Sequence, residues 1–128
     1  PAAKCSVTAV TMQNTKKVSA VHEIPADIVA AQIIEVVRDL GTDIVKIGML
    51  SSVSVIESVH NAFNEVGPRI PRVVDPVMRS KGGHVLLAAS AAKACAECLI
   101  KGAALVTPNL PEAEVLTGLK IKTLADIG

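Results

Sequence analysis

Short runs of β-branched and apolar residues alternate with amphipathic stretches along most of the chain. Such short runs predict strands, whereas apolar residues that recur every three or four positions predict helices. We expect strands at residues 4–12, 18–24, 43–50, 72–77 and 103–108. We expect helices at residues 25–40, 54–66, 88–100 and 110–118. The first strand reads as buried, and the second alternates as an exposed edge strand does.

Several residues predict where the helices begin and end. Pro25 suits the first turn of a helix that Gly41 would end. Ser54 and Glu57 have the spacing of a capping box, and Gly67 offers the corresponding stop. The alternation of strands with helices of this length predicts parallel strand pairing, because a parallel neighbour requires a crossover connection. The predicted fold class is therefore α/β, with residues 1–128 forming a single domain.

Polar residues gather where four of the predicted strands end. In α/β sheets, ligands bind outside the carboxyl ends of the strands, so these positions are the candidate site. The four strand ends are residues 12–15, 48–50, 75–83 and 107–114. At the first of them, Gln13 and Asn14 are equally consistent with an Asx-type turn and with ligand contact.

Asp75 and the pair Asn109 and Glu112 each have two interpretations. Asp75 lies at the tip of a buried strand, where it can cap a loop or orient a hydrated Mg²⁺ ion or a phosphate. Asn109 and Glu112 match a capping box, with Pro111 in the first turn. A helix that begins at a strand end also receives a phosphate–Mg²⁺ complex well. The structural and the functional interpretation are therefore compatible for this pair.

Other candidate motifs predict packing rather than chemistry. Cys95 and Cys98 lie inside an Ala-rich helical stretch rather than at a helix start, which favours core packing over redox or zinc chemistry. The three histidines are His22, His60 and His84. They have neither the spacing of a metal site nor a neighbouring nucleophile, so we expect no catalytic role for them. Lys81, Gly82 and Gly83 match neither standard nucleotide-binding fingerprint, although they could form a flexible loop on the phosphate side.

Composition narrows the classes of function. Half of the residues are apolar and 20% are charged, which excludes disorder. The net charge is +1 and Phe63 is the only aromatic residue, so we expect no nucleic-acid partner. No apolar run approaches the length of a membrane span, and the first ten residues do not resemble a secretory signal. The odd number of cysteines, three, favours a reducing cytosol, so we expect a cytoplasmic protein.

Five segments in order carry a family resemblance: SVTAVTMQNT, IVAAQIIEVVRD, KIGML, VVDPVM followed by KGG, and VTPNLPEAEVLTG. They resemble the middle of a hydroxymethylpyrimidine/phosphomethylpyrimidine kinase of thiamin biosynthesis. The resemblance implies a ribokinase-like three-layer sandwich with a mostly parallel sheet, truncated at both ends. It also implies ATP and Mg²⁺ as cofactors and a small pyrimidine substrate.

The resemblance also implies roles for particular residues. Gln13 resembles the side chain that hydrogen-bonds the aminopyrimidine, and Met49 and Val77 resemble the apolar walls around that ring. Asp75 is similar to the acidic residue near the transferred phosphate. Asn109 and Glu112 are similar to the pair that organises Mg²⁺ and phosphates, which makes Asp75 and Glu112 the candidate metal ligands.

Departures from the family pattern suggest that this polypeptide is inactive by itself. Family members open with a Gly-rich strand and continue into a Gly-Thr-Gly anion hole beside the catalytic base, and neither feature is present in this sequence. Without those N–H donors the largest electrostatic contribution to catalysis is missing. The sheet edges left by truncation predict self-association into a homo-oligomer. A pyridoxal-type kinase and a non-catalytic α/β binding module remain the alternative interpretations.

Overall fold

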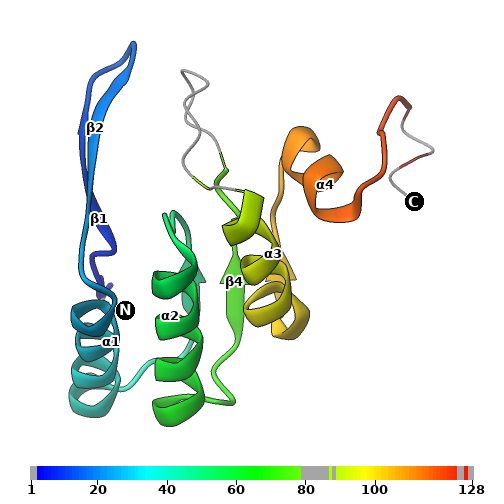
Figure 1. Ribbon diagram of the computed structural model, residues 1–128. Helices are drawn as coiled ribbons and strands as arrows, with labels where there is room; N and C mark the ends of the chain where they lie inside the picture. Colours follow the sequence, from blue (N-terminus) through cyan, green and yellow to red (C-terminus); the bar gives the residue numbers. More distant parts are fainter. Residues whose placement is uncertain (1–2, 79–86, 88, 124–125, 127–128) are drawn as a thin grey trace.

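The computed structural model describes residues 3–78, 87, 89–123 and 126. Its strands are β1 (Ala9–Gln13), β2 (Val18–Glu23), β3 (Val45–Ile47), β4 (Arg72–Val74) and β5 (Leu105–Val106). Its helices are α1 (Ala26–Leu40), α2 (Val53–Val66), α3 (Ala89–Cys98) and α4 (Leu110–Thr117), with a 3₁₀ helix η1 at Ile100–Gly102. Each predicted strand and helix has a counterpart, although the first strand differs in its bounds and burial, and strands and helices alternate from α1 onward as the sequence indicates (Figure 1).

The central sheet is parallel, with strand order β3-β4-β5. Its register aligns Ile47 with Val74 and Val74 with Val106. Ile47 and Val74 face the helices and are buried, whereas Lys46 and Leu105 point to the opposite face and are exposed. This alternation follows from the twofold period of side chains along a strand. Strands β3, β4 and β5 and the helices that Ile47 and Val74 face thus form two layers.

Helices α1, α2 and α3 pack side by side, with α2 between the other two (Figure 1). The apolar stripe of α2 provides the centre of the core because it contacts both neighbouring helices. Its fully buried Ile56 and the Leu99 side chain beyond α3 each contribute roughly 2 kcal/mol through burial. The core comprises Val29, Ile33, Ile47, Leu50, Val55, Ile56, Val59, Ala62, Phe63, Val74, Met78, Leu87, Ala91, Ala92, Cys95 and Leu99.

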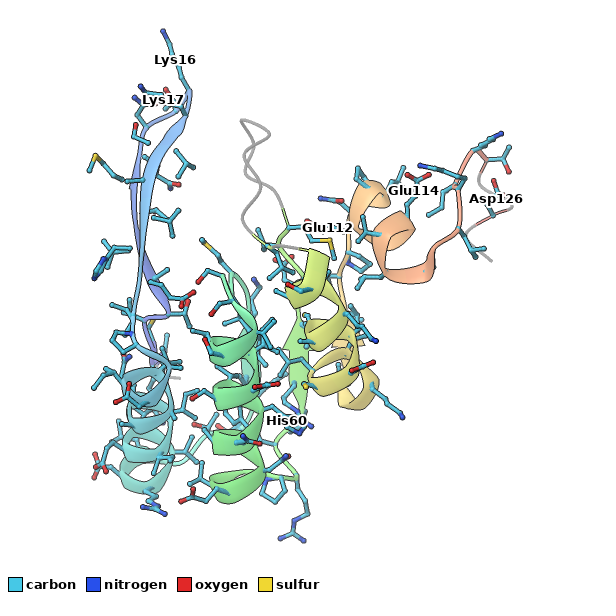
Figure 2. All side chains as sticks on the ribbon, viewed as in Figure 1. Lys16, Lys17, His60, Glu112, Glu114 and Asp126 are labelled. Atoms are coloured by element: carbon cyan, nitrogen blue, oxygen red, sulfur yellow. The ribbon has the colours of Figure 1, made fainter. Side chains whose placement is uncertain are left out.

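Strands β1 and β2 form a separate antiparallel hairpin. It extends away from the helices, with Lys16 and Lys17 at its tip (Figures 1 and 2). The prediction of a buried strand at residues 4–12 is wrong, since β1 begins only at Ala9 and most of its residues are exposed or half-buried. The strand ending at Gln13 is therefore not part of the parallel sheet. The prediction of a strand at residues 18–24 is confirmed by β2.

The predicted helix stops at Gly41 and Gly67 agree with the structure, whereas one predicted helix start differs. Helix α1 ends at Gly41 and α4 at Gly118, and both glycines adopt the positive φ that favours glycine, 64° and 71°. Helix α2 ends at Gly67, but its N-cap is Ser52 rather than Ser54. The Ser52 hydroxyl oxygen accepts a hydrogen bond from the Val55 amide at 3.4 Å. The predicted capping box of Ser54 and Glu57 is therefore wrong, and the N-cap lies two residues earlier than predicted.

Some predictions fall on residues outside the described part of the chain. These are the loop at residues 79–83, including Lys81, Gly82 and Gly83, together with His84 and the first residue of the predicted helix at 88–100. Within the described residues, no helix is both long enough and apolar enough to cross a membrane.

Candidate functional site

Three strand ends meet along one edge of the parallel sheet. The Asp75 amide donates to the Ile47 carbonyl at 2.8 Å, and the Thr107 amide donates to the Val74 carbonyl at 3.0 Å. These bonds extend the ladder one residue beyond the strands, so that the segments after β3, β4 and β5 leave the sheet at the same level. The edge thus gathers the segments that carry Met49, Asp75 and Asn109, as the sequence predicts for parallel strands.

The Asp75 carboxylate pairs with a lysine and is also partly exposed to solvent. Its carboxylate oxygen Oδ2 accepts a hydrogen bond from Lys46 Nζ at 3.0 Å, and its side chain is 33% exposed. The Asp75 carbonyl also accepts from the Val77 amide at 2.8 Å, which closes a tight turn across Pro76. The turn is thus closed by the Asp75 backbone, while the side chain pairs with Lys46 and keeps a third of its surface exposed to solvent.

Glu112 connects the loop after β4 to the start of α4. Its Oε2 accepts from the Asn109 amide at 2.9 Å, while Asn109 Oδ1 accepts from the Glu112 amide at 2.9 Å. This reciprocal pair confirms the predicted capping box. The other carboxylate oxygen, Oε1, accepts from the Met78 amide at 3.2 Å. Glu112 is 5% exposed and joins the two candidate phosphate-binding segments (Figure 2).

Met49 and Val77, the predicted apolar walls, are both half-buried at this edge. Met49 lines a cavity of about 650 Å³ that continues along β3 toward Phe63 of α2. The cavity includes neither Asp75 nor Glu112. We therefore place the candidate site by the strand ends rather than by this cavity, which follows the open edge of β3.

Gln13 lies apart from the other candidate residues. The base of the hairpin is tied to the segment after β3, because the Thr8 hydroxyl donates to the Met49 carbonyl at 2.9 Å and the Ser51 hydroxyl donates to the Glu23 carboxylate. Gln13 is five residues beyond Thr8, which is roughly 16 Å along an extended strand. Its side chain is exposed, and no described contact brings it to Met49.

Asn14 makes the turn that was one of its two predicted roles. Its side-chain oxygen accepts hydrogen bonds from the Lys16 and Lys17 amides, both at 2.9 Å. Its own amide donates to the Lys17 carbonyl at 3.0 Å. These bonds close the hairpin as an Asx-type turn. Asn14 therefore has a structural role at the hairpin tip.

The edge suits Mg²⁺ better at Asp75 than at Glu112. Mg²⁺ in phosphoryl-transfer sites takes one or two carboxylates and completes its shell with phosphate oxygens and water. Asp75 offers an accessible carboxylate, whereas each Glu112 oxygen already accepts a backbone N–H. No group of three or more His, Cys, Asp or Glu side chains among the described residues could hold a metal.

The thiols behave as packing residues. Burial raises the pKa of the Cys95 thiol, and the neighbouring Cys98 raises it further. The pKa of Cys98 is also raised, mainly by partial burial and then by Glu57 and Glu97. A raised pKa keeps a thiol protonated and poorly nucleophilic at neutral pH. These observations support the packing interpretation of the Cys95 and Cys98 pair.

In a parallel α/β sheet, polar residues at the carboxyl edge are typical of a ligand-binding site. A family model described as phosphomethylpyrimidine kinase matches residues 2–128. The chain belongs to the phosphomethylpyrimidine kinase family. This confirms the resemblance carried by the five sequence segments.

Curated relatives are hydroxymethylpyrimidine/phosphomethylpyrimidine kinases. The Mycobacterium tuberculosis protein is 43% identical over 116 residues, which are 91% of this chain and 42% of that protein. The Bacillus subtilis protein is 43% identical over 122 residues, which are 94% of this chain and 44% of that protein. The chain therefore spans less than half the length of these relatives.

Solved structures show the same ribokinase-like fold. The phosphomethylpyrimidine kinase of Clostridium difficile superposes with a TM-score of 0.85 at 42% identity, covering 95% of this chain and 52% of that structure. The Staphylococcus aureus pyridoxal kinase in complex with pyridoxal superposes with a TM-score of 0.78 at 31% identity, covering 95% of this chain and 44% of that structure. The predicted fold class is thereby confirmed.

Proposed function

We propose that this chain is the part of a hydroxymethylpyrimidine/phosphomethylpyrimidine kinase that carries the acidic edge of the active site. The complete protein would transfer the terminal phosphoryl group of ATP to the hydroxymethyl group of the pyrimidine and then to the resulting monophosphate. The observation that carries the proposal is the Met78–Glu112 hydrogen bond, which brings the loop of Asp75 to the beginning of α4.

The chain's own residues divide into two groups in this proposal. Met49 and Val77 would pack against the pyrimidine ring, and Gln13 would hydrogen-bond its edge if the hairpin bends toward the sheet. Asp75, Asn109 and Glu112 would organise the phosphates, with Asp75 and Glu112 as the metal-binding carboxylates. Glu112 would act mainly by holding the Met78 and Asn109 amides, because both its oxygens are engaged.

The bound Mg²⁺ would neutralise charge on the phosphates as the phosphoryl group is transferred. Asp75 supplies a carboxylate on the exposed side of the turn, where such a complex can approach. The beginning of α4 supplies a positive helix end beside it, at Asn109 and Leu110. Together these features favour an anionic ligand with its counterion at this edge. The three free thiols fit a protein that works in a reducing cytosol.

Pyridoxal phosphorylation is the second candidate, because pyridoxal kinases share the fold over almost the whole chain. The identity of 31%, against 42% for the phosphomethylpyrimidine kinase, favours the pyrimidine substrate. Both substrates present a hydroxymethyl group on a small aromatic ring, so the fold by itself does not separate them.

A comparison of the two substrates tests the proposed function. The complete gene product that contains this chain would be incubated with MgATP and either hydroxymethylpyrimidine or pyridoxal, and ADP release would be measured. We expect a kcat/KM at least about tenfold higher for the pyrimidine. A preference for pyridoxal would support the second candidate, and no ADP release with either substrate would contradict both.

A further inference from the structure

One charged residue interrupts the apolar strand β3. Lys46 lies between Val45 and Ile47, and its Nζ atom is 3.0 Å from Oδ2 of Asp75 on the neighbouring strand. In the sheet register Lys46 stands beside Val73, two positions before Asp75. Side chains two positions apart on a strand share a face. Lys46 and Asp75 are therefore on the same open face, and the lysine side chain runs along it toward the carboxyl edge.

Gly48 leaves the path of this side chain free. A Cβ atom added at Gly48 would lie 3.8 Å from Lys46 Nζ, so the ammonium group sits beside a residue without a side chain. Alanine would make ordinary contact there, whereas a branched side chain would compete for the space that the ammonium group occupies. In the sequence Lys46-Ile47-Gly48, the missing side chain of the glycine thus leaves space for the lysine side chain to reach Asp75.

The ion pair fixes the direction of the Asp75 carboxylate. A carboxylate at a strand end can adopt several staggered rotamers, and a charge-assisted hydrogen bond selects one of them. Lys46 is the only basic residue in the described part of the chain that pairs with Asp75. The Lys46 side chain is 65% exposed, and exposed pairs add little to stability. Its effect is therefore expected on orientation rather than on folding.

We propose that Lys46 is a positioning residue that holds the Asp75 carboxylate toward the phosphate-binding edge, an inference that rests on the proposed function. The Asp75 backbone is fixed by its hydrogen bond to Ile47, and the Lys46 ammonium fixes the side chain from the same strand. Among the described residues, the other carboxylate oxygen, Oδ1, accepts no hydrogen bond, and in this proposal it faces a Mg²⁺–phosphate complex. Loss of Lys46 would disorder the orientation of this oxygen without removing it.

A double-mutant cycle in the complete protein tests this role. The four proteins are the wild type, Lys46→Met, Asp75→Asn and the double variant. We expect Lys46→Met to lower kcat about tenfold while KM for the pyrimidine stays within about twofold. Since Lys46 acts through Asp75, the double variant should be no slower than Asp75→Asn. Lys46→Arg should restore most of the rate, because a guanidinium can also pair with the carboxylate.

Lys93→Met is the matched control. Lys93 pairs with Glu97 at 3.9 Å on the exposed surface of α3, so its loss removes a comparable ion pair far from the edge. We expect this variant to keep the wild-type kcat. A tenfold loss in Lys93→Met, or multiplicative losses in the double variant, would overturn the positioning role of Lys46.

Calorimetric binding of Mg²⁺ with the non-hydrolysable analogue AMP-PCP separates this inference from the proposed function. We expect Lys46→Met to weaken binding about fivefold in the wild-type background and not at all in Asp75→Asn. If neither substrate is phosphorylated but this pattern is found, the proposed function fails and the role of Lys46 stands. Equal weakening in both backgrounds, or no binding by the wild type, would overturn it.

Discussion

The Met78 amide donates a hydrogen bond to Glu112 Oε1 across 34 positions of sequence, at 3.2 Å. The bond joins the loop after β4 to the first turn of α4 in a buried setting. A single carboxylate thereby holds the loop after β4 through one oxygen and closes the capping box with Asn109 through the other. Glu112 therefore stabilises both the start of α4 and the loop after β4.

The two hydrogen bonds accepted by Glu112 predict that even a conservative substitution destabilises the fold. In Glu112→Gln, one acceptor oxygen becomes an NH₂ group that would face a backbone N–H donor. We expect a loss of about 1–3 kcal/mol in the free energy of unfolding, the usual cost of a buried unsatisfied donor. Denaturant unfolding of the complete protein measures it, with Glu97→Gln on the exposed side of α3 as the control. Equal stability of the two variants would contradict the buried arrangement.

Gln13 is the candidate residue with the least structural support, so its variant is informative. The side chain is exposed, and Gln13→Ala should therefore leave the unfolding temperature unchanged. If Gln13 hydrogen-bonds the pyrimidine, the substitution should weaken substrate binding by about 1–3 kcal/mol. Steady-state KM for the pyrimidine in the complete protein, with Ser19→Ala on β2 as a control, measures the effect. A wild-type KM would remove Gln13 from the site.

Acid should loosen the segment that follows α4. The Ile121 amide donates to Glu114 Oε1 at 2.9 Å, and this bond, with a smaller effect of Lys120, lowers the pKa of the Glu114 carboxyl (Figure 2). A carboxyl whose pKa is lowered by folding stabilises the structure above its unfolded pKa and loses this contribution as the pH falls through the folded pKa. We expect the protection of the Ile121 amide against hydrogen exchange to be lost as the pH falls through the lowered pKa of Glu114, below the usual range of a glutamate carboxyl.

Glu114→Gln provides the control for this pH effect. Its amide oxygen can accept from Ile121 but does not titrate, so protection in this variant should stay constant over the same pH range. The same loss of protection in both proteins would show that another group controls the segment.

The open face of the sheet predicts self-association of the 128-residue polypeptide. Ile44 is 60% exposed and Leu105 55% exposed, and β3 is an edge strand of the described sheet. Exposed apolar surface beside an unpaired strand edge favours contact between copies. Light scattering at micromolar concentration should show species larger than a monomer, and Ile44→Lys combined with Leu105→Lys should reduce them. A monomer that unfolds cooperatively would contradict this prediction.

Local sequence signals predicted the helices and the parallel sheet well. Gly41 and Gly118 adopt backbone conformations that few other residues adopt. The three-residue spacing of Asn109 and Glu112 predicts the two hydrogen bonds that these residues exchange. In contrast, the spacing of Ser54 and Glu57 predicted the wrong N-cap for α2. Periodicity does not distinguish Ser52 from Ser54, and the choice depends on where the chain leaves β3.

The hairpin and Lys46 were missed for different reasons. Only the four residues 14–17 separate β1 from β2, which is too short for the crossover of a parallel pair, so this signal was present in the sequence. A lysine inside a short apolar strand was also visible, but its partner could not be predicted. The Lys46–Asp75 contact depends on the register of β3 against β4, which forms only through tertiary pairing.

The turnover number of Asp75→Asn in the complete protein tests the central claim that this edge of the sheet is a phosphoryl-transfer site. The substitution keeps the shape of the side chain and removes the charge that would face Mg²⁺. At saturating hydroxymethylpyrimidine and MgATP we predict a fall in kcat of about 10² or more with an unchanged unfolding temperature. A kcat equal to that of the wild type would contradict the claim and leave Asp75 with a structural role alone.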